Sequence, residues 1–196
     1  MEPDKGREYL DAYESFLGPL RDRPVRLLEI GVGNGASLRL WRDYFPNGIV
    51  AGLDREAVAI DGPSSRVRIY RGLQEDVALL DRIGAEAGPF DVVVDDASHV
   101  AEATRVSFWH LARHHLKPHG FFIVEDWGTG YWDSWPDGRR YEGRNHVHGM
   151  VAFVKELVDE VGMEDITKPG RGLSPPHAPL FRSMHIFSGH VLLQKA

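Results

Sequence analysis

The chain has 196 residues, a hydrophobic share of 42%, a charged share of 27% and a formal net charge of −6, values that suit one globular domain rather than a disordered chain. No apolar run reaches membrane-spanning length, the first residues do not resemble a signal peptide, and there is no cysteine for disulfides or thiolate metal ligands. We therefore expect a single domain over residues 1–196 of a soluble, cytoplasmic protein that binds no membrane, and the negative charge argues against nucleic acid as a partner.

The first expected element is a helix over roughly residues 5–21, inside an N-terminal segment 1–23. Arg23-Pro24 should end it, because the residue before a proline disfavours helical geometry. The pattern leaves open whether this helix is a lid over a site, a cover for the core or a contact in a homo-oligomer. It is predicted from one apolar stripe at helical spacing: Tyr9, Leu10, Tyr13, Phe16, Leu17 and Leu20.

Strand-like apolar runs then alternate with helical patterns, which is typical of an α/β protein with a mostly parallel sheet. The expected strands span residues 25–30, 49–54, 67–71, 90–95 and 120–125, and the expected helices lie near 36–44, 75–85, 100–115 and 147–161. A loop over 168–176 precedes two more strands at 183–187 and 190–194, and their two-residue link predicts an antiparallel hairpin.

The loop after the first expected strand is rich in glycine and reads Glu29-Ile30-Gly31-Val32-Gly33-Asn34-Gly35-Ala36. Glycine lets the main chain adopt a positive φ and lets a ligand lie close to it. The glycine spacing with Ala36 also fits a dinucleotide fingerprint, so the loop alone does not separate NAD from other adenosyl cofactors. Asp54 ends the second expected strand, where an acid commonly binds ribose hydroxyls. Together these features predict binding of an adenosine-containing molecule.

Acidic side chains follow two later strands. Asp95 and Asp96 come after the run at 90–94, with His99 three residues further on, and Glu125-Asp126 follow the run at 121–124. The carboxyl ends of parallel strands border one crevice, so we expect these acids to meet there. Hard divalent ions such as Mg²⁺ seek oxygen clusters, and a neighbouring histidine can accept a proton. The sequence therefore predicts a metal-assisted enzyme.

These motifs carry a family resemblance. The segment 25–35, with Asp43-Tyr44-Phe45-Pro46 and Asp54, resembles the opening of a class I S-adenosylmethionine methyltransferase. The resemblance is narrower for three later segments, which are similar to the Mg²⁺-dependent sugar O-methyltransferases of macrolide biosynthesis, the mycinamicin and macrocin group. These segments are 95–99, 116–120 and 124–132. The resemblance implies a Rossmann-like fold: a mostly parallel seven-stranded sheet with a C-terminal antiparallel hairpin and helices on both faces. It also implies methyl transfer from S-adenosylmethionine to a hydroxyl on a glycosylated small molecule in antibiotic biosynthesis.

The resemblance further implies roles for single residues. His99 matches the general base. Asp95 is expected either to contact the cofactor directly, or to cap the helix that follows it or hydrogen-bond the neighbouring loop. The chain departs from the family at His119, where glycine is usual, and at Gly128-Thr129-Gly130. The implied cofactor-binding residues are Glu29, Gly31, Gly33, Gly35, Asp54, Gln74 and Asp76, and the implied metal ligands are Asp96, Glu125 and Asp126.

Several alternatives stay open at this point. An NAD-dependent oxidoreductase is disfavoured because the chain has no Tyr-x-x-x-Lys pair, and a noncatalytic accessory protein that retains the pocket is disfavoured by the intact acids. The acids themselves also fit ordinary solvated strand ends. The aromatic residues after the second acidic pair either line an acceptor site or pack on the N-terminal helix; they are Trp127, Tyr131, Trp132 and Trp135.

The other histidines are not expected to be catalytic. One set is expected to be solvated and consists of His110, His114, His115 and His119. A second pair, His146 and His148, is expected to lie in a loop or at a helix start.

Overall fold

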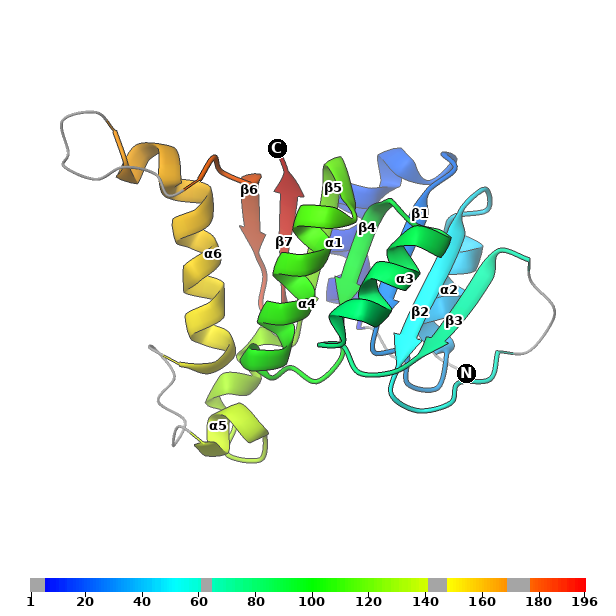
Figure 1. Ribbon diagram of the computed structural model, residues 1–196, viewed down its shortest axis with the longest axis horizontal. Coiled ribbons are helices and arrows are strands. Elements are labelled where there is room, and N and C mark those ends of the chain that lie inside the picture. Colours follow the sequence, from blue (N-terminus) through cyan, green and yellow to red (C-terminus); the bar gives the residue numbers. More distant parts are fainter. Residues whose placement is uncertain (1–5, 61–64, 141–147, 169–176) are drawn as a thin grey trace.

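The computed structural model describes residues 6–60, 65–140, 148–168 and 177–196 (Figure 1). His146 and most of the expected loop at 168–176 lie outside these residues. In chain order the elements are α1 (Arg7–Leu17), η1 (Gly18–Leu20), β1 (Arg26–Ile30), α2 (Ala36–Tyr44), β2 (Ile49–Asp54), β3 (Val67–Arg71), α3 (Val77–Ala87), β4 (Phe90–Asp95), α4 (Ala101–His114), β5 (Leu116–Glu125), η2 (Trp127–Tyr131), α5 (Pro136–Arg140), α6 (Gly149–Ile166), β6 (Phe181–Ile186) and β7 (His190–Lys195).

Seven strands form one sheet in the order β3-β2-β1-β4-β5-β7-β6. Strands β1 to β5 run parallel, and β7 runs antiparallel to both β5 and β6. This arrangement confirms the expected parallel sheet with a terminal hairpin. The strand order changes direction between β1 and β4, and in open α/β sheets ligands bind beside the carboxyl ends of the strands at such a point.

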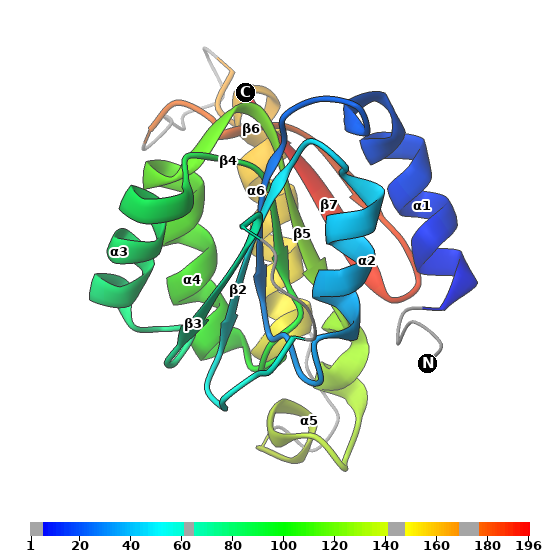
Figure 2. The same ribbon diagram turned by 90° about the vertical axis from the view of Figure 1, so that its right-hand side faces the viewer.

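Helices cover both faces of the sheet, as Figure 2 shows. Helices α3, α4 and α6 pack on one face and α1 and α2 on the other, and each face has its own apolar cluster. Alternation along a strand assigns neighbouring residues to opposite faces: Leu27 of β1 packs with α1 and α2, whereas Leu28 packs with the other layer. No helix among the described residues is both long and apolar enough to cross a lipid bilayer.

Several helices and strands begin or end at other residues than the sequence predicts. The α-helical part of α1 ends at Leu17, and the chain continues as the short 3₁₀ helix η1, which has Pro19 near its start. Strand β5 begins at Leu116, four residues before the expected start, and helix α6 continues to Ile166. Helices η2 and α5 occupy a segment that was expected to be a loop, because their aromatic and glycine residues carry no clear helical period.

Candidate active site

A cavity of about 450 Å³ lies at the carboxyl ends of the central strands. Residues from the β1–α2 loop form one side of it, and residues that follow β4 and β5 form the other. Helix α1 and the residue before it contribute Tyr9 and Gly6, so the N-terminal segment borders the cavity. The lining residues are Gly6, Tyr9, Gly31, Val32, Gly33, Asn34, Ala36, Ser37, Asp54, Asp96, Ala97, His99, Glu125 and Asp126.

The glycine loop brings two strand ends together. Gly31 has φ +85°, and a Cβ built on it would lie 2.1 Å from the main-chain oxygen of Asp96, so the loops after β1 and β4 approach closely only if residue 31 is glycine. Glu29 is fully buried beneath the loop and accepts hydrogen bonds from Ser37 Oγ at 2.6 Å and Trp41 Nε1 at 3.1 Å. Glu29 thereby fixes the start of α2 against β1. Gly35 has a positive φ and precedes α2, outside the lining of the cavity.

Asp54 lies at the end of β2 and lines the cavity. Its Oδ2 accepts hydrogen bonds from the main-chain N–H groups of Val32 at 2.8 Å and Gly33 at 2.9 Å, and its Oδ1 accepts one from Glu56 at 2.9 Å. Asp54 therefore holds the glycine loop in place. Its role toward a ribose stays a prediction.

Three further implied cofactor residues lie outside the lining of the cavity. Asp95 is buried and accepts a hydrogen bond from Ser107 Oγ at 2.8 Å, and Gln74 Nε2 lies 3.3 and 3.4 Å from its two carboxylate oxygens. Burial raises the pKa of Asp95 to about 7, although the hydrogen bond from Ser107 opposes this shift. Gln74 Oε1 accepts from the N–H of Ser98, so this network supports the loop after β4. Asp76 caps α3 by accepting from the N–H of Leu79 at 3.0 Å.

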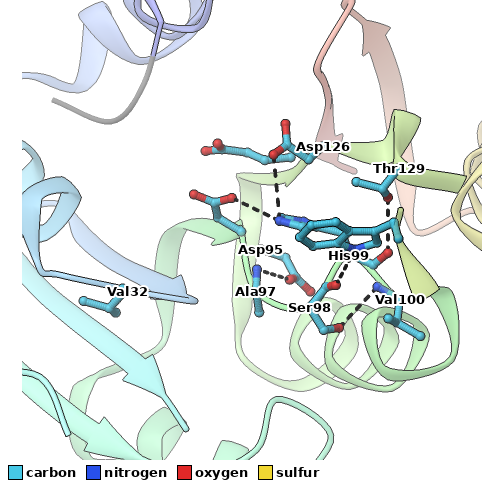
Figure 3. A network of polar contacts seen from close by, with 12 residues as sticks. Val32, Asp95, Ala97, Ser98, His99, Val100, Asp126 and Thr129 are labelled. Atoms are coloured by element: carbon cyan, nitrogen blue, oxygen red, sulfur yellow. Dashed lines mark hydrogen bonds and ion pairs between the residues drawn. The ribbon is translucent and has the colours of Figure 1, made fainter. Parts of the chain in front are cut away.

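The acids and the histidine that follow β4 and β5 converge on the cavity. His99 Nε2 lies 3.9 Å from Asp96 Oδ1 and 3.8 Å from Asp126 Oδ2, and one ligand atom of each of these three residues lies within 4.8 Å of the others (Figure 3). Glu125 is 3% exposed and lines the same cavity. Oxygen and imidazole donors at this separation suit a divalent cation.

Backbone strain and specific contacts fix the position of His99. Both His99 and Asp126 have φ +51°, a conformation that costs energy for residues other than glycine and clusters at functional sites. Thr129 Oγ1 donates to the main-chain oxygen of His99 at 3.3 Å, and the Trp135 indole N–H donates to that of Ser98 at 3.1 Å. The Trp135 ring lies against His99, with 5.6 Å between the ring centroids. Figure 3 shows His99 pointing toward Asp126, with Thr129 bonded to the main chain of His99.

Two tyrosines of α1 bind the carboxylates at the end of β5. Tyr9 donates its hydroxyl hydrogen to Asp126 Oδ1 at 2.6 Å, and the buried Tyr13 donates to Glu125 Oε1. Burial, together with the adjacent acids, raises the pKa of both hydroxyls above the usual range, so they remain donors. The apolar stripe in the sequence predicted which face of α1 packs inward. The sequence did not indicate that the tyrosine hydroxyls on this face bind Asp126 and Glu125.

The aromatic segment after β5 divides into buried and exposed members. Trp127 is partly buried and donates its indole N–H to the main-chain oxygen of Phe187 at 3.1 Å. Trp135 lies against His99, whereas Tyr131 and Trp132 are 42% and 51% exposed. Helix η2 packs on α5 and α6. The segment therefore supports the loop of His99, and the rings of Tyr131 and Trp132 are exposed.

Comparison with known proteins gives several relatives, although no family model matches the chain. The chain is 33% identical to an 8-demethyl-8-(2-methoxy-α-L-rhamnosyl)-tetracenomycin-C 3′-O-methyltransferase from Streptomyces olivaceus, over 93% of this chain and 48% of the relative. It is also 33% identical to a mycinamicin VI 2″-O-methyltransferase from Micromonospora griseorubida, over 91% of this chain and 44% of the relative. The chain thus spans about half the length of the curated relatives it matches.

A solved structure described as the MycE methyltransferase from the mycinamycin biosynthetic pathway, in complex with Mg and SAH, matches the fold. Its TM-score is 0.83 at 30% identity, covering 99% of this chain and 51% of that one. A second structure of MycE, in complex with Mg, SAH and mycinamycin VI, matches with a TM-score of 0.81 and 30% identity, covering 99% and 50%.

Proposed function

The chain is a homologue of sugar O-methyltransferases of antibiotic pathways and has their class I methyltransferase fold, and we propose that it transfers a methyl group from S-adenosylmethionine to a sugar hydroxyl of a secondary metabolite, assisted by Mg²⁺. One observation carries this proposal: the glycine loop and the acids of β4 and β5 border the same cavity. A cofactor held by the loop would therefore lie beside an ion held by the acids. The alternatives of an NAD-dependent oxidoreductase and an accessory protein gain no support from these relatives.

The residues that line and support the cavity suit both S-adenosylmethionine and a Mg²⁺ ion. We propose that Gly31, Gly33 and Asp54 hold the cofactor directly, while Glu29 and Gly35 shape the loop, and Gln74, Asp76 and Asp95 support the pocket from outside its lining. Asp96, Glu125 and Asp126 would hold the ion, because carboxylates that converge without a cation repel one another. Bound Mg²⁺ would lower the pKa of the acceptor hydroxyl and orient it.

His99 is the proposed base. Its Nε2 lies 3.9 Å from Asp96 and 3.8 Å from Asp126, beside the proposed ion ligands, where it can accept the proton of the acceptor hydroxyl. As the proton leaves, the acceptor oxygen bonds to the sulfonium methyl carbon, the carbon–sulfur bond breaks, and S-adenosylhomocysteine remains. Because Trp135 and Thr129 hold the His99 loop, the base is positioned before the acceptor binds, and a base positioned in this way contributes typically about 10²–10⁴-fold to the rate.

The acceptor is proposed to be a small glycosylated molecule. The exposed rings of Tyr131 and Trp132 follow the metal-binding acids, and aromatic faces pack well on sugars. The net charge of −6 disfavours a polyanion such as RNA in this place. That residues 1–196 act as one domain and that the protein is cytoplasmic stay predictions, and a homo-oligomer contact stays one of the open interpretations of the N-terminal helix.

The test is release of S-adenosylhomocysteine from S-adenosylmethionine with glycosylated acceptors. We expect EDTA to abolish release and Mg²⁺ to restore it. Asp96→Asn should lower the rate at least about 100-fold, because it removes an ion ligand while keeping the side-chain shape. The matched control is Asp159→Asn, an exposed acid of α6 outside the lining of the cavity, which should keep the wild-type rate. Turnover that survives both EDTA and Asp96→Asn would contradict the mechanism.

Binding distinguishes the cofactors without any acceptor. S-adenosylhomocysteine at 100 times its Kd should stabilise the fold by about 2.7 kcal/mol in a thermal unfolding assay, whereas NAD should not. Stabilisation by NAD alone would favour the oxidoreductase.

A further inference from the structure

A second group of potential metal ligands lies between α3 and the end of α4. His110 Nε2 and His115 Nε2 lie 2.7 and 2.8 Å from the same oxygen, Oδ1 of Asp81. One ligand atom from each of these three residues lies within 4.8 Å of the other two. Among the described residues, only this group and the group around His99 have this property. We call it the Asp81 cluster.

The Asp81 cluster is separate from the proposed active site. The main-chain oxygen of His115 accepts a hydrogen bond from Phe90, the first residue of β4, whereas the proposed ion ligands lie at or just after the last residues of β4 and β5. The two groups thus lie at opposite ends of the same strands. Figure 1 shows α3 and α4 side by side on one face of the sheet. A ligand of the Asp81 cluster would therefore act independently of the proposed methyl transfer.

The two imidazoles are held in place. Gly84, one helical turn after Asp81, faces His115, and a Cβ built on residue 84 would lie 2.1 Å from His115 Nδ1. The absence of a side chain at this position makes room for the ring. The side chains of His110 and His115 are each only 16% exposed, and their ring centroids lie 5.4 Å apart. Neither histidine is a freely solvated surface residue, in contrast to what the sequence predicts.

The donor set selects the type of ion. Two imidazole nitrogens and one carboxylate oxygen favour borderline ions such as Zn²⁺, whereas the oxygen-rich group at the cavity suits Mg²⁺. Ligands of a tetrahedral ion at about 2.0–2.1 Å stand about 3.3 Å from one another. Asp81 is 56% exposed, so its side chain can move outward by the roughly half an ångström that this geometry needs.

We propose that Asp81, His110 and His115 bind one Zn²⁺, with water as the fourth ligand. The ion would join α3 to the end of α4 and so stabilise this side of the sheet. His114 provides a matched control, because its ring centroid is only 5.0 Å from that of His110 but it is exposed and does not belong to the cluster. A general preference of Zn²⁺ for surface histidines would involve His114 equally.

The test is a calorimetric titration of the chelator-treated protein with Zn²⁺, in excess Mg²⁺. Asp96→Asn is used as the background because it weakens the group at the cavity. One Zn²⁺ should bind in this background. Adding Asp81→Asn or His110→Gln should weaken binding at least about tenfold, and adding His114→Gln should leave it unchanged. Circular dichroism in Zn²⁺-free buffer checks that each variant is folded.

Nitrogen chemical shifts identify the ligands directly. Long-range ¹H–¹⁵N spectra should show that Zn²⁺ shifts the Nε2 signals of His110 and His115 and leaves those of His114 in place. The proposal would be overturned if no Zn²⁺ bound to the Asp96→Asn background. It would also be overturned if adding Asp81→Asn or His110→Gln left the affinity for Zn²⁺ the same as in that background. The cluster would then be a hydrogen-bonded histidine–aspartate group and nothing more.

Discussion

At the scale of single residues, the proposed ion ligands depend on hydroxyl donors from a distant helix. Tyr13 donates to Glu125 in a buried contact, and Tyr9 donates to Asp126. A carboxylate that has left water needs such donors, and their loss costs free energy. Helix α1 therefore does more than cover the sheet, since its hydroxyls orient acids that lie more than 110 positions away in the sequence, at separations of 112 and 117 residues.

Tyr13→Phe should lower the free energy of unfolding by about 1–3 kcal/mol, because the buried Glu125 loses a donor. Urea denaturation without divalent ions measures this change. Tyr44→Phe is the matched control, since Tyr44 donates to Glu14 in an exposed contact and its loss should cost less than about 1 kcal/mol. Equal effects of the two substitutions would contradict the role assigned to Tyr13.

Asp95 makes stability depend on pH. Because burial raises its pKa from 3.8 to about 7, the folded state keeps a proton that the unfolded chain has already released. Its contribution to stability is therefore full below about pH 3.8, falls as the pH rises to about 7 and is constant above that.

Asp95→Asn cannot ionise at this position. The free energy of unfolding of this variant, minus that of the wild type, should therefore rise between pH 5 and pH 8, by about 2–3 kcal/mol. Urea denaturation at the two pH values in EDTA measures the difference. The same difference at both pH values would show that Asp95 is ionised in the fold throughout.

Which residues meet at the cavity was predictable only in part. Gly31, Asp96 and Asp126 were expected there because they follow strands whose carboxyl ends share an edge. The contacts of Trp135 and Thr129 with the His99 loop were not expected. The segment that contains η2 and α5 has no regular spacing of apolar residues from which its packing could be predicted. Gln74 was expected beside a ligand, yet in the structure it binds Asp95 and Ser98.

At the scale of elements, the parallel strands were the easiest to predict. Strands β2, β3 and β4 have the expected bounds, because buried apolar runs between turns define them. Strand β5 starts earlier than expected because the segment containing Pro118 and His119 still belongs to it, with an irregular register opposite β4. His119 has φ +61°, which explains why the resemblance has glycine at this position.

One buried acid ties two helices together. Asp137 of α5 is 3% exposed, and its Oδ2 accepts hydrogen bonds from the main-chain N–H groups of Ala101 at 3.1 Å and Met150 at 2.9 Å. These groups belong to the first turns of α4 and α6, where the helix dipoles favour a negative charge. A short helix that the sequence did not predict thus positions two long ones.

Asp137→Ala should therefore lower the free energy of unfolding by about 2–4 kcal/mol, because it removes two charge-assisted caps. Asp76→Ala removes the single cap of α3 and should cost only about 1 kcal/mol. Urea denaturation of both variants gives the comparison. If Asp76→Ala were the more damaging of the two, the role of Asp137 in both helices would be wrong.

At the scale of the whole molecule, the sheet separates two apolar clusters of different composition. Phe108 lies at the centre of the larger one, with its ring centroid 4.4 Å from that of Phe122, 5.2 Å from Phe153 and 5.3 Å from Phe181. These rings come from α4, β5, α6 and β6. The cluster therefore connects the C-terminal half of the chain, on the face opposite α1.

Phe108→Ala should destabilise the protein by about 3–5 kcal/mol, because no neighbour can fill the space that the ring leaves. Val106→Ala on the same helix is the control, since Val106 is 38% exposed and its loss should cost less than about 1 kcal/mol. Thermal and urea unfolding measure both. A small effect at Phe108 would mean that the cluster repacks.

The left-handed conformations of His99 and Asp126 bear on any attempt to redesign this protein by saturation mutagenesis. Each replacement at either position must meet two separate requirements. It must first adopt the left-handed backbone conformation, which mainly glycine, asparagine and aspartate do, and only then does the chemistry of its side chain affect activity. Valine, isoleucine and threonine would fail for conformational reasons alone. Asparagine at 99 or 126 is thus the informative replacement, because any activity it loses reports the missing imidazole or carboxylate and not a distorted loop.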